Sequence, residues 1–237
     1  MCTVTFIPNK TGFILTSSRD ESIDRATEVP TVHYHKDKKY YYPRDESASG
    51  SWIGVSETGV ICCLLNGAME KHQKNAKHTR SRGLVLLDCL SKDGLPDYID
   101  HIELINVEPF TLLYFNPFNS NKAYQFMWDG KHKLLTPIDT QTAAIWSSAT
   151  LYSPEIRLSK STHFNQFILQ RKSELKNDAL QFHLHKSNLF ESEMLGLKTV
   201  SISQIIYQDS QIYFKYLDLT NNNRQNIIIQ PCISETE

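Results

Sequence analysis

The sequence predicts an α+β protein in which two antiparallel sheets are stacked between outer layers of helices. Three observations support this class. Strand-like runs of β-branched and aromatic residues fill the start of the chain, helical patterns with capping signals lie in its middle, and strand-like runs return over residues 200–217. This order favours two sheets with helical outer layers over a doubly wound parallel sheet, in which strands and helices alternate.

The first predicted element is a β-hairpin at the start of the chain. Residues 3–7 (TVTFI) and residues 13–18 (FILTSS) have the composition of strands. Residues 8–12 (PNKTG) between them are turn formers, so we place the turn near Lys10.

This hairpin gives the second residue, Cys2, a chemical context. Antiparallel pairing sets Cys2 opposite Ser18 or Arg19, so the run 18–21 (SRDE) emerges beside the N-terminus. If Met1 is removed, Cys2 carries both a thiol and a free α-amine, whose ordinary pKa values are roughly 8.5 and 7.7–8.0. The amine can therefore act as the base for the thiol, while a nearby guanidinium favours the thiolate. The alternative is an incidental cysteine beside a solvated strand end.

A second hairpin is predicted over residues 50–65. Residues 50–55 (GSWIGV) and 60–65 (VICCLL) flank the turn 56–59 (SETG), and the second strand is almost wholly apolar, as in a buried sheet. It ends at Asn66-Gly67. A side-chain amide at the mouth of a buried strand can donate a hydrogen bond to an oxyanion. The alternative is that Asn-Gly only begins a turn.

The remaining elements complete the predicted layers. Ser153 and Pro154 signal a helix start by capping and by proline at the first helical position. We predict helices over residues 80–90, 96–102, 154–175 and 178–185, and strands over residues 110–115, 123–128, 133–135, 144–151, 200–207 and 211–217. The chain shows no linker or repeat, so we expect a single domain over residues 1–237 with a loosely ordered polar tail from about 221.

Several motifs, taken in order, resemble those of the NRDE family, which includes transport and Golgi organisation protein 2. The resemblance covers most of the chain to about residue 218. The motifs are Met1-Cys2-Thr3, Ser18-Arg19-Asp20-Glu21, Trp52-Ile53-Gly54-Val55, Leu64-Leu65-Asn66-Gly67, Pro109-Phe110-Thr111-Leu112, Trp128-Asp129-Gly130, residues 145–152 (IWSSATLY) and Thr199-Val200-Ser201.

The resemblance implies an N-terminal-nucleophile (Ntn) hydrolase-like fold, a four-layer αββα sandwich. It also implies a distant relation to cysteine amidohydrolases that cleave bile-salt conjugates and penicillin V. Carried over by motif, Cys2 is the nucleophile, Arg19 and Asp20 attend it, and Asn66 helps to bind the oxyanion.

The chain departs from the family pattern at two positions. The leading asparagine of the NRDE signature is Ser18 here, and a later asparagine of the amidohydrolases has Ser148 as its nearest counterpart. We count Ser18 and Ser148, together with Glu21 and Trp52, as candidate ligand-binding residues. A serine hydroxyl can still donate a hydrogen bond.

Three functions stay open at this point. The first is a cysteine hydrolase that cleaves a non-peptide C–N (amide) bond through a thioester. The second is a binding or carrier protein for a small hydrophobic or anionic molecule, such as haem or an acyl conjugate. The third is a structural protein without a ligand pocket at Cys2. Fold alone does not choose among them.

Composition narrows the possible partners. A net charge of −1 gives no global attraction to nucleic acid, and no apolar run is long enough for a membrane span. Five cysteines, an odd number, favour reduced thiols and a cytoplasmic location. We expect a small-molecule ligand or substrate, no metal and no other cofactor, and the oligomeric state is left open.

Overall fold

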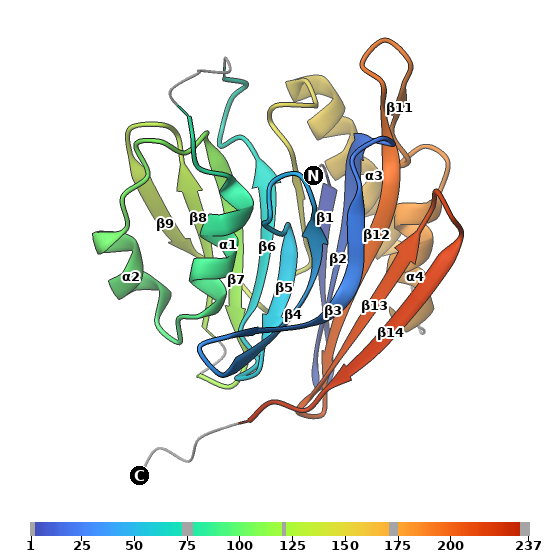
Figure 1. Cartoon of the computed structure of the whole chain (residues 1–237). Helices are drawn as coiled ribbons and strands as arrows, with labels where there is room; N and C mark the ends of the chain where they lie inside the picture. The colour runs from blue at the N-terminus through green and yellow to red at the C-terminus, as the bar shows by residue number, and fades with distance from the viewer. Residues whose placement is uncertain (1–2, 73–77, 120–121, 171–174, 233–237) are drawn as a thin grey trace.

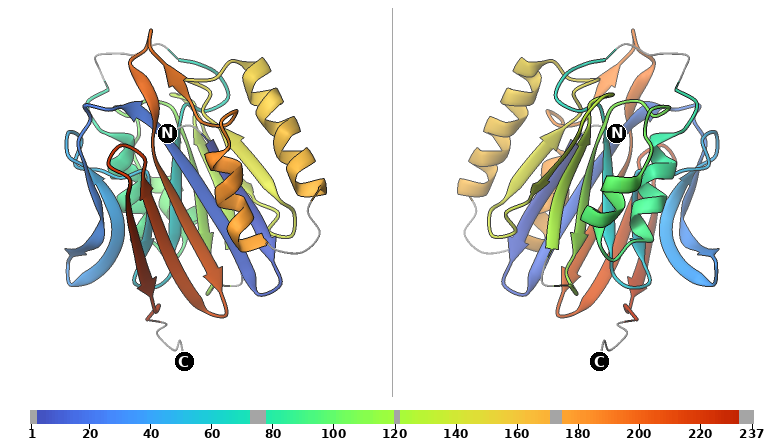
Figure 2. Two further views of the ribbon diagram at one scale, coloured as in Figure 1. Left: turned by 90° about the vertical axis from the view of Figure 1, so that its right-hand side faces the viewer. Right: turned by 90° about the vertical axis from the view of Figure 1, so that its left-hand side faces the viewer.

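The computed structural model describes residues 3–72, 78–119, 122–170 and 175–232 (Figure 1). Two antiparallel sheets stand face to face, and helices lie against the outer face of each (Figures 1 and 2). The predicted α+β class and the four-layer αββα sandwich are therefore confirmed.

The first sheet contains the N-terminal hairpin at its centre. Within the described ranges it has seven strands, in the order β10-β1-β2-β12-β13-β14, with β11 paired to β12. The strands are β1 (Thr3–Asn9), β2 (Gly12–Ser22), β10 (Ala144–Ser147), β11 (Glu191–Ser192), β12 (Leu197–Gln208), β13 (Gln211–Asp218) and β14 (Asn223–Ile229).

The second sheet follows chain order. In the part of the chain that is described, its seven strands run β3-β4-β5-β6-β7-β8-β9. The strands are β3 (Thr27–His35), β4 (Lys38–Asp45), β5 (Ile53–Ser56), β6 (Ile61–Asn66), β7 (Phe110–Asn116), β8 (Lys122–Trp128) and β9 (Lys133–Pro137).

Strand alternation supplies the apolar layer between the sheets. In β1, Val4 and Phe6 point toward the second sheet, whereas Thr3 and Thr5 lie on the other face. Phe6 stacks on Phe115 of β7 with ring centroids 5.3 Å apart. The two sheets are therefore joined by a continuous aromatic and aliphatic core.

The helices cover the outer faces. Helices α1 (Arg82–Leu90) and α2 (Leu95–His101) bury their apolar sides against the second sheet, and α3 (Pro154–Leu169) and α4 (Leu175–Leu184) cover part of the first. Ser81 and Ser153 cap α1 and α3 by accepting from backbone N–H groups. None of the helices in the described ranges is long and apolar enough to cross a membrane.

Both predicted hairpins are present. β1 and β2 are joined at Lys10-Thr11, and the register sets Thr3 opposite Ser18 and Asn9 opposite Gly12. β5 and β6 pair as expected around residues 57–60. Cys2 itself lies outside the described residues.

Several predicted boundaries differ from the observed ones, and three of them have a clear cause. The strand predicted over 144–151 stops at Ser147, because the chain turns there toward α3. The helix predicted over 80–90 begins only at Arg82, since Arg80 forms a bridge to Val107. The helix predicted to reach residue 175 ends at Leu169, and residues 171–174 lie outside the described ranges.

The tail predicted to be loosely ordered from about 221 is also different. Residues 223–229 form β14, which pairs with β13 along its whole length. Ile227 and Ile229 pack against the core between the sheets, and this burial outweighs the polar composition around them.

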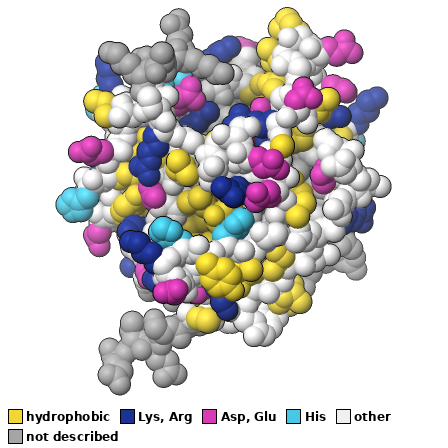
Figure 3. All heavy atoms as spheres, viewed as in Figure 1, with side chains coloured by type: hydrophobic (Ala, Val, Ile, Leu, Met, Phe, Trp, Pro, Cys, Tyr) yellow, Lys and Arg dark blue, Asp and Glu magenta, His cyan; other side chains and the backbone are white. Residues whose placement is uncertain are grey.

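Acidic and basic side chains are interspersed on the face seen in Figure 3. This mixture agrees with the net charge of −1.

Two neighbouring residues of β14 test whether this strand packs as described. Ile229 is 1% exposed and Ile228 is 64% exposed. We predict that Ile229→Ala lowers the free energy of unfolding by about 2–5 kcal/mol because it leaves a cavity. Ile228→Ala should change it by less than about 0.5 kcal/mol. Urea denaturation of both variants measures this difference, and equal small effects would show that β14 is not part of the core.

Candidate active site

Arg19 is the central charged group of the candidate site. It lies near the end of β2 with its side chain directed toward the second sheet, and it is only 3% exposed. Its Nη2 donates to Oδ2 of Asp45 at 3.0 Å, and its guanidinium carbon lies 4.4 Å above the centre of the Trp52 ring. Because Asp45 ends β4, this ion pair connects the two sheets.

Asp45 is shared by two cations. Arg25 Nε donates to the same Oδ2 at 2.7 Å, while Oδ1 of Asp45 accepts from the backbone N–H of Ala48. Arg25 also approaches Glu21 at 3.5 Å. Burial lowers the pKa of Arg19, and the charges of Asp45 and Glu21 oppose that effect. An arginine remains protonated under such conditions, so Arg19 supplies a fixed positive charge.

Asp20 points the opposite way, as alternation along a strand requires. It is 4% exposed and accepts hydrogen bonds from Tyr152 Oη and from Thr199 Oγ1, both at 2.6 Å. A register shift in β12 between Thr199 and Ser201 sets Thr199 opposite Asp20 and Ser201 opposite Arg19. The carboxylate is therefore oriented by two hydroxyls on the helical side of the sheet.

Ser18 shares that face with Asp20. Its hydroxyl lies 2.7 Å from Nδ1 of His183 in α4, and Thr5 Oγ1 lies 2.9 Å from the other ring nitrogen. Complete burial, with a smaller effect from the nearby Lys160 cation, lowers the pKa of His183 to about 3. A neutral imidazole thus fastens α4 to the N-terminal hairpin.

Asn66 and Ser148 meet across the sheets. Ser148 Oγ donates to the backbone carbonyl of Asn66 at 2.7 Å. The next residue, Gly67, has φ +84°, donates to Pro109 O and accepts from Thr111 Oγ1, each at 3.0 Å. Ser148 therefore supports the backbone at Asn66, the residue that ends β6.

Four of the predicted residues line one small pocket of about 80 Å³: Arg19, Glu21, Trp52 and Asn66. Ser18 and Asp20 lie on the other face of β2. Ser148 does not line this pocket and contacts the backbone carbonyl of Asn66. The full lining consists of Arg19, Glu21, Arg25, Asp45, Ala48, Gly50, Ser51, Trp52, Leu64, Asn66, Ser81, Arg82 and Gly83.

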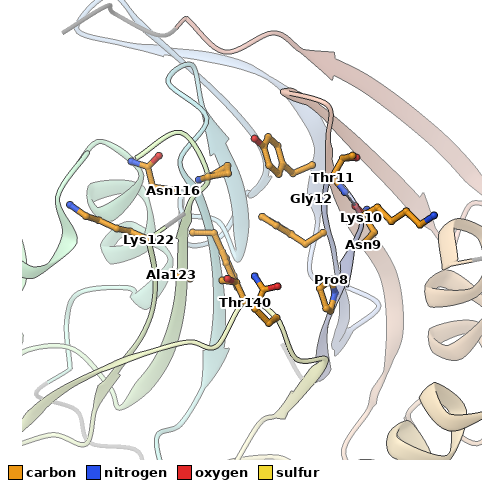
Figure 4. A pocket seen from close by; sticks show the side chains of 14 residues that line it. Pro8, Asn9, Lys10, Thr11, Gly12, Asn116, Lys122, Ala123 and Thr140 are labelled. Carbon is orange, nitrogen blue, oxygen red and sulfur yellow. Dashed lines mark hydrogen bonds between the residues drawn. The ribbon is translucent and has the colours of Figure 1, made fainter. Parts of the chain in front are cut away.

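A second hollow, of about 270 Å³, lies at the opposite end of the sandwich beside the turn of the first hairpin (Figure 4). Its wall includes Lys10, Asn116 and Lys122. Figure 4 shows the two lysine side chains extending away from the hollow on opposite sides. None of the predicted site residues lines this second hollow. We therefore take the pocket lined by Arg19 as the candidate site.

Several site residues escaped the sequence prediction. Asp45 has no local signal, because it meets Arg19 only through the stacking of the sheets. Tyr152 and Thr199 belong to motifs of the family resemblance, yet no role followed from sequence. His183 lies in α4, within the helix predicted over residues 178–185, but no role at the site followed from sequence.

Comparisons with known proteins identify the family of this chain. The family model described as TANGO2: Transport and Golgi organisation 2 matches residues 1–234. The chain belongs to this family. A comparison with curated proteins finds no match.

Two solved structures share the fold of this Transport and Golgi organisation 2 family member. An N-acylethanolamine-hydrolyzing acid amidase (NAAA) ortholog from Caenorhabditis elegans has 11% identity and a TM-score of 0.59, with coverage of 86% of this chain and 92% of that chain. A mutant conjugated bile acid hydrolase from Clostridium perfringens has 10% identity and a TM-score of 0.52, with coverage of 96% and 92%. The Ntn-hydrolase-like fold is thereby confirmed.

Removal of the Asp45 carboxylate tests the ion pair between the sheets. We predict that Asp45→Asn lowers the free energy of unfolding by about 3–5 kcal/mol, because Arg19 is left charged and buried without its partner. Glu28→Gln is the control, since it breaks an exposed pair with Arg44. That change should cost less than about 1 kcal/mol by urea denaturation. Similar values for the two variants would contradict the assignment.

The lowered pKa of His183 predicts a pH effect on stability. Its unfolded pKa is about 6.5, so on acidification the unfolded chain takes up a proton before the folded protein does. The contribution of His183 to the free energy of unfolding is therefore fully present above about pH 6.5. It decreases as the pH falls toward 3, by up to about 1.4 kcal/mol per pH unit.

Between about pH 7 and about pH 5, wild type should lose about 2 kcal/mol more than His183→Gln in urea denaturation. His185→Gln, an exposed position two residues later, should behave as wild type. An unchanged pH dependence in His183→Gln would show that this imidazole is not enclosed.

Proposed function

We propose that this protein is an N-terminal-nucleophile cysteine hydrolase that cleaves a non-peptide C–N (amide) bond. Cys2 is the nucleophile, with Arg19, Asp20 and Asn66 as its attendants. The observation that carries the proposal is the convergence of Arg19 and Asn66, from different sheets, on one pocket.

The register of the first hairpin supports this role for position 2. Thr3 is paired with Ser18, and the next residue of β2 is Arg19. Position 2 also has the sequence parity of Val4 and Phe6, which face the second sheet together with Arg19. The proposal therefore assigns Arg19 to the thiol and Asp20 to the α-amine.

The proposed reaction begins once Met1 is removed. The α-amine of Cys2 takes the thiol proton, and the thiolate attacks the amide carbonyl carbon. The side-chain amide of Asn66 donates a hydrogen bond to the oxyanion. Collapse breaks the C–N bond, the protonated α-amine gives its proton to the leaving amine, and a thioester remains.

Water completes the cycle. The α-amine accepts a proton from the attacking water, the C–S bond breaks to release the carboxylic acid and the thiolate, and the protonated α-amine returns its proton to the sulfur. The net change is hydrolysis of one amide to an acid and an amine. Asp20, oriented by Tyr152 and Thr199, holds the protonated α-amine in place.

The names of the structural neighbours support hydrolysis over the carrier alternative. One is named for hydrolysis of N-acylethanolamines and the other for hydrolysis of conjugated bile acids. A small-molecule amide is accordingly the proposed substrate, and the cytoplasm, with its reducing conditions, is the proposed location.

Labelling by an electrophilic amide or lactam tests the nucleophile. We predict that intact mass shows a protein beginning at Cys2 with a single adduct, and that Cys2→Ala removes both the adduct and turnover. Cys62, Cys63 and Cys89 are buried, and burial raises their pKa, that of Cys63 to about 12, so they should remain unmodified.

Cys232 supplies the matched control, because it is an exposed free thiol in the described part of the chain. Cys232→Ala should label and turn over as wild type. Turnover that survives in Cys2→Ala, or an active preparation that retains Met1, would refute the mechanism. Ligand binding without any adduct would favour the carrier alternative.

A further inference from the structure

A larger pocket lies on the other side of Asn66 from the Arg19 pocket. It occupies the space where β6, β7 and β8 face β10 and α3, and its volume is about 380 Å³. That size is within the range of small-molecule sites. The lining residues that matter here are Leu65, Met127, Trp146 and Arg157.

The wall of this pocket combines apolar side chains from both sheets with polar ones such as Thr111 and Gln125. Leu65 and Met127 come from the second sheet, and Ile145 and Trp146 come from β10 of the first. Trp146 is held in place, because its Nε1 donates to Gln125 Oε1 at 2.7 Å. Unbranched methionine fits ligands of varied shape. An apolar chain or ring system would therefore be well accommodated.

The pocket adjoins the site of the proposed reaction. Its residue Leu65 directly precedes Asn66, and its residue Ser147 pairs with Thr3 at the start of β1. A ligand bound here would therefore extend toward the N-terminus of the chain.

One cation with unused donors lines the same pocket. Arg157, in the first turns of α3, donates from Nη1 to the carbonyl of Met69 at 3.2 Å. Its Nε is shielded from solvent and has no hydrogen-bond partner among the described residues. Nor does any carboxylate of the described chain form an ion pair with it. A partly buried guanidinium with a shielded, unsatisfied donor favours an anionic partner.

From this geometry we infer the substrate class: an amide with an apolar body, bound against Met127 and Trp146, and a single anionic group, bound by Arg157. The inference rests on the proposed function for the reaction, but the binding site stands on its own contacts. Arg157 thereby selects among apolar amides by charge, and the sheets supply the apolar contacts.

Another apolar hollow allows a matched comparison. It has a volume of about 440 Å³, lies on the first sheet beside α4, and is lined by Tyr213, Ile227 and Arg224 among others. Arg224 is thus a second arginine at the rim of an apolar hollow, far along the chain from the proposed site. Its substitution controls for non-specific uptake of an amphiphile.

The test uses two probes of equal chain length, octanoate and octanol, with the Cys2→Ala protein so that no chemistry occurs. Calorimetric titration should show that octanoate binds about tenfold more tightly than octanol. Adding Arg157→Gln should abolish this preference while octanol affinity is unchanged, which also shows that the variant is folded. Adding Arg224→Gln should leave both affinities unchanged.

Three results would overturn the inference: no binding of either probe, a preference for octanoate that persists in Arg157→Gln, or one that disappears in Arg224→Gln. The two proposals fail separately. If wild-type protein forms no Cys2 adduct but Arg157 still favours octanoate over octanol, only the proposed reaction is refuted. If Cys2 is labelled but octanoate is not favoured, only the substrate class is refuted.

Discussion

The guanidinium of Arg19 is enclosed where the two sheets meet, and it requires a carboxylate from the opposite sheet. Asp45 provides it at 3.0 Å, and the Trp52 ring covers the cation at 4.4 Å. A buried charge that loses its partner is costly, so the sheets must stack with β2 and the end of β4 in register. This contact therefore holds the end of β2 against the end of β4, and β4 is connected through β5 to β6, the strand that ends at Asn66. The candidate site exists because those two segments meet.

Alternation along β2 divides the polar groups between two environments. Arg19 faces the second sheet, whereas Ser18 and Asp20 face the helical layer, where His183 and Tyr152 meet them. One strand thus presents a fixed cation on one side and an oriented carboxylate on the other. The strand thus separates the cation from the carboxylate, and the ion pair of Arg19 is made with Asp45 instead.

Local patterns of the sequence predicted much of the fold. Turn formers near Lys10 defined the first hairpin, and Ser153 with Pro154 defined the start of α3. Long-range contacts were not predictable in this way. Asp45 carries no signal of its pairing with Arg19, and the polar residues around Ile227 and Ile229 concealed β14. The arrangement of the site residues was the hardest part to predict, because a register shift of one residue exchanges the two faces of a strand. The SRDE run was therefore recognised as important, but which of its side chains share a pocket required the structure.

The central claim of the proposed function is that Arg19, held by Asp45, sets the charge around Cys2, the proposed nucleophile. Its most direct test is the pKa of the Cys2 thiol, measured from the pH dependence of the alkylation rate in mature protein and in Arg19→Gln. Loss of a neighbouring cation should raise the thiol pKa by about one unit or more, with Cys232 alkylation as the internal reference. A folded Arg19→Gln protein whose Cys2 is alkylated with an unchanged pKa would contradict the account.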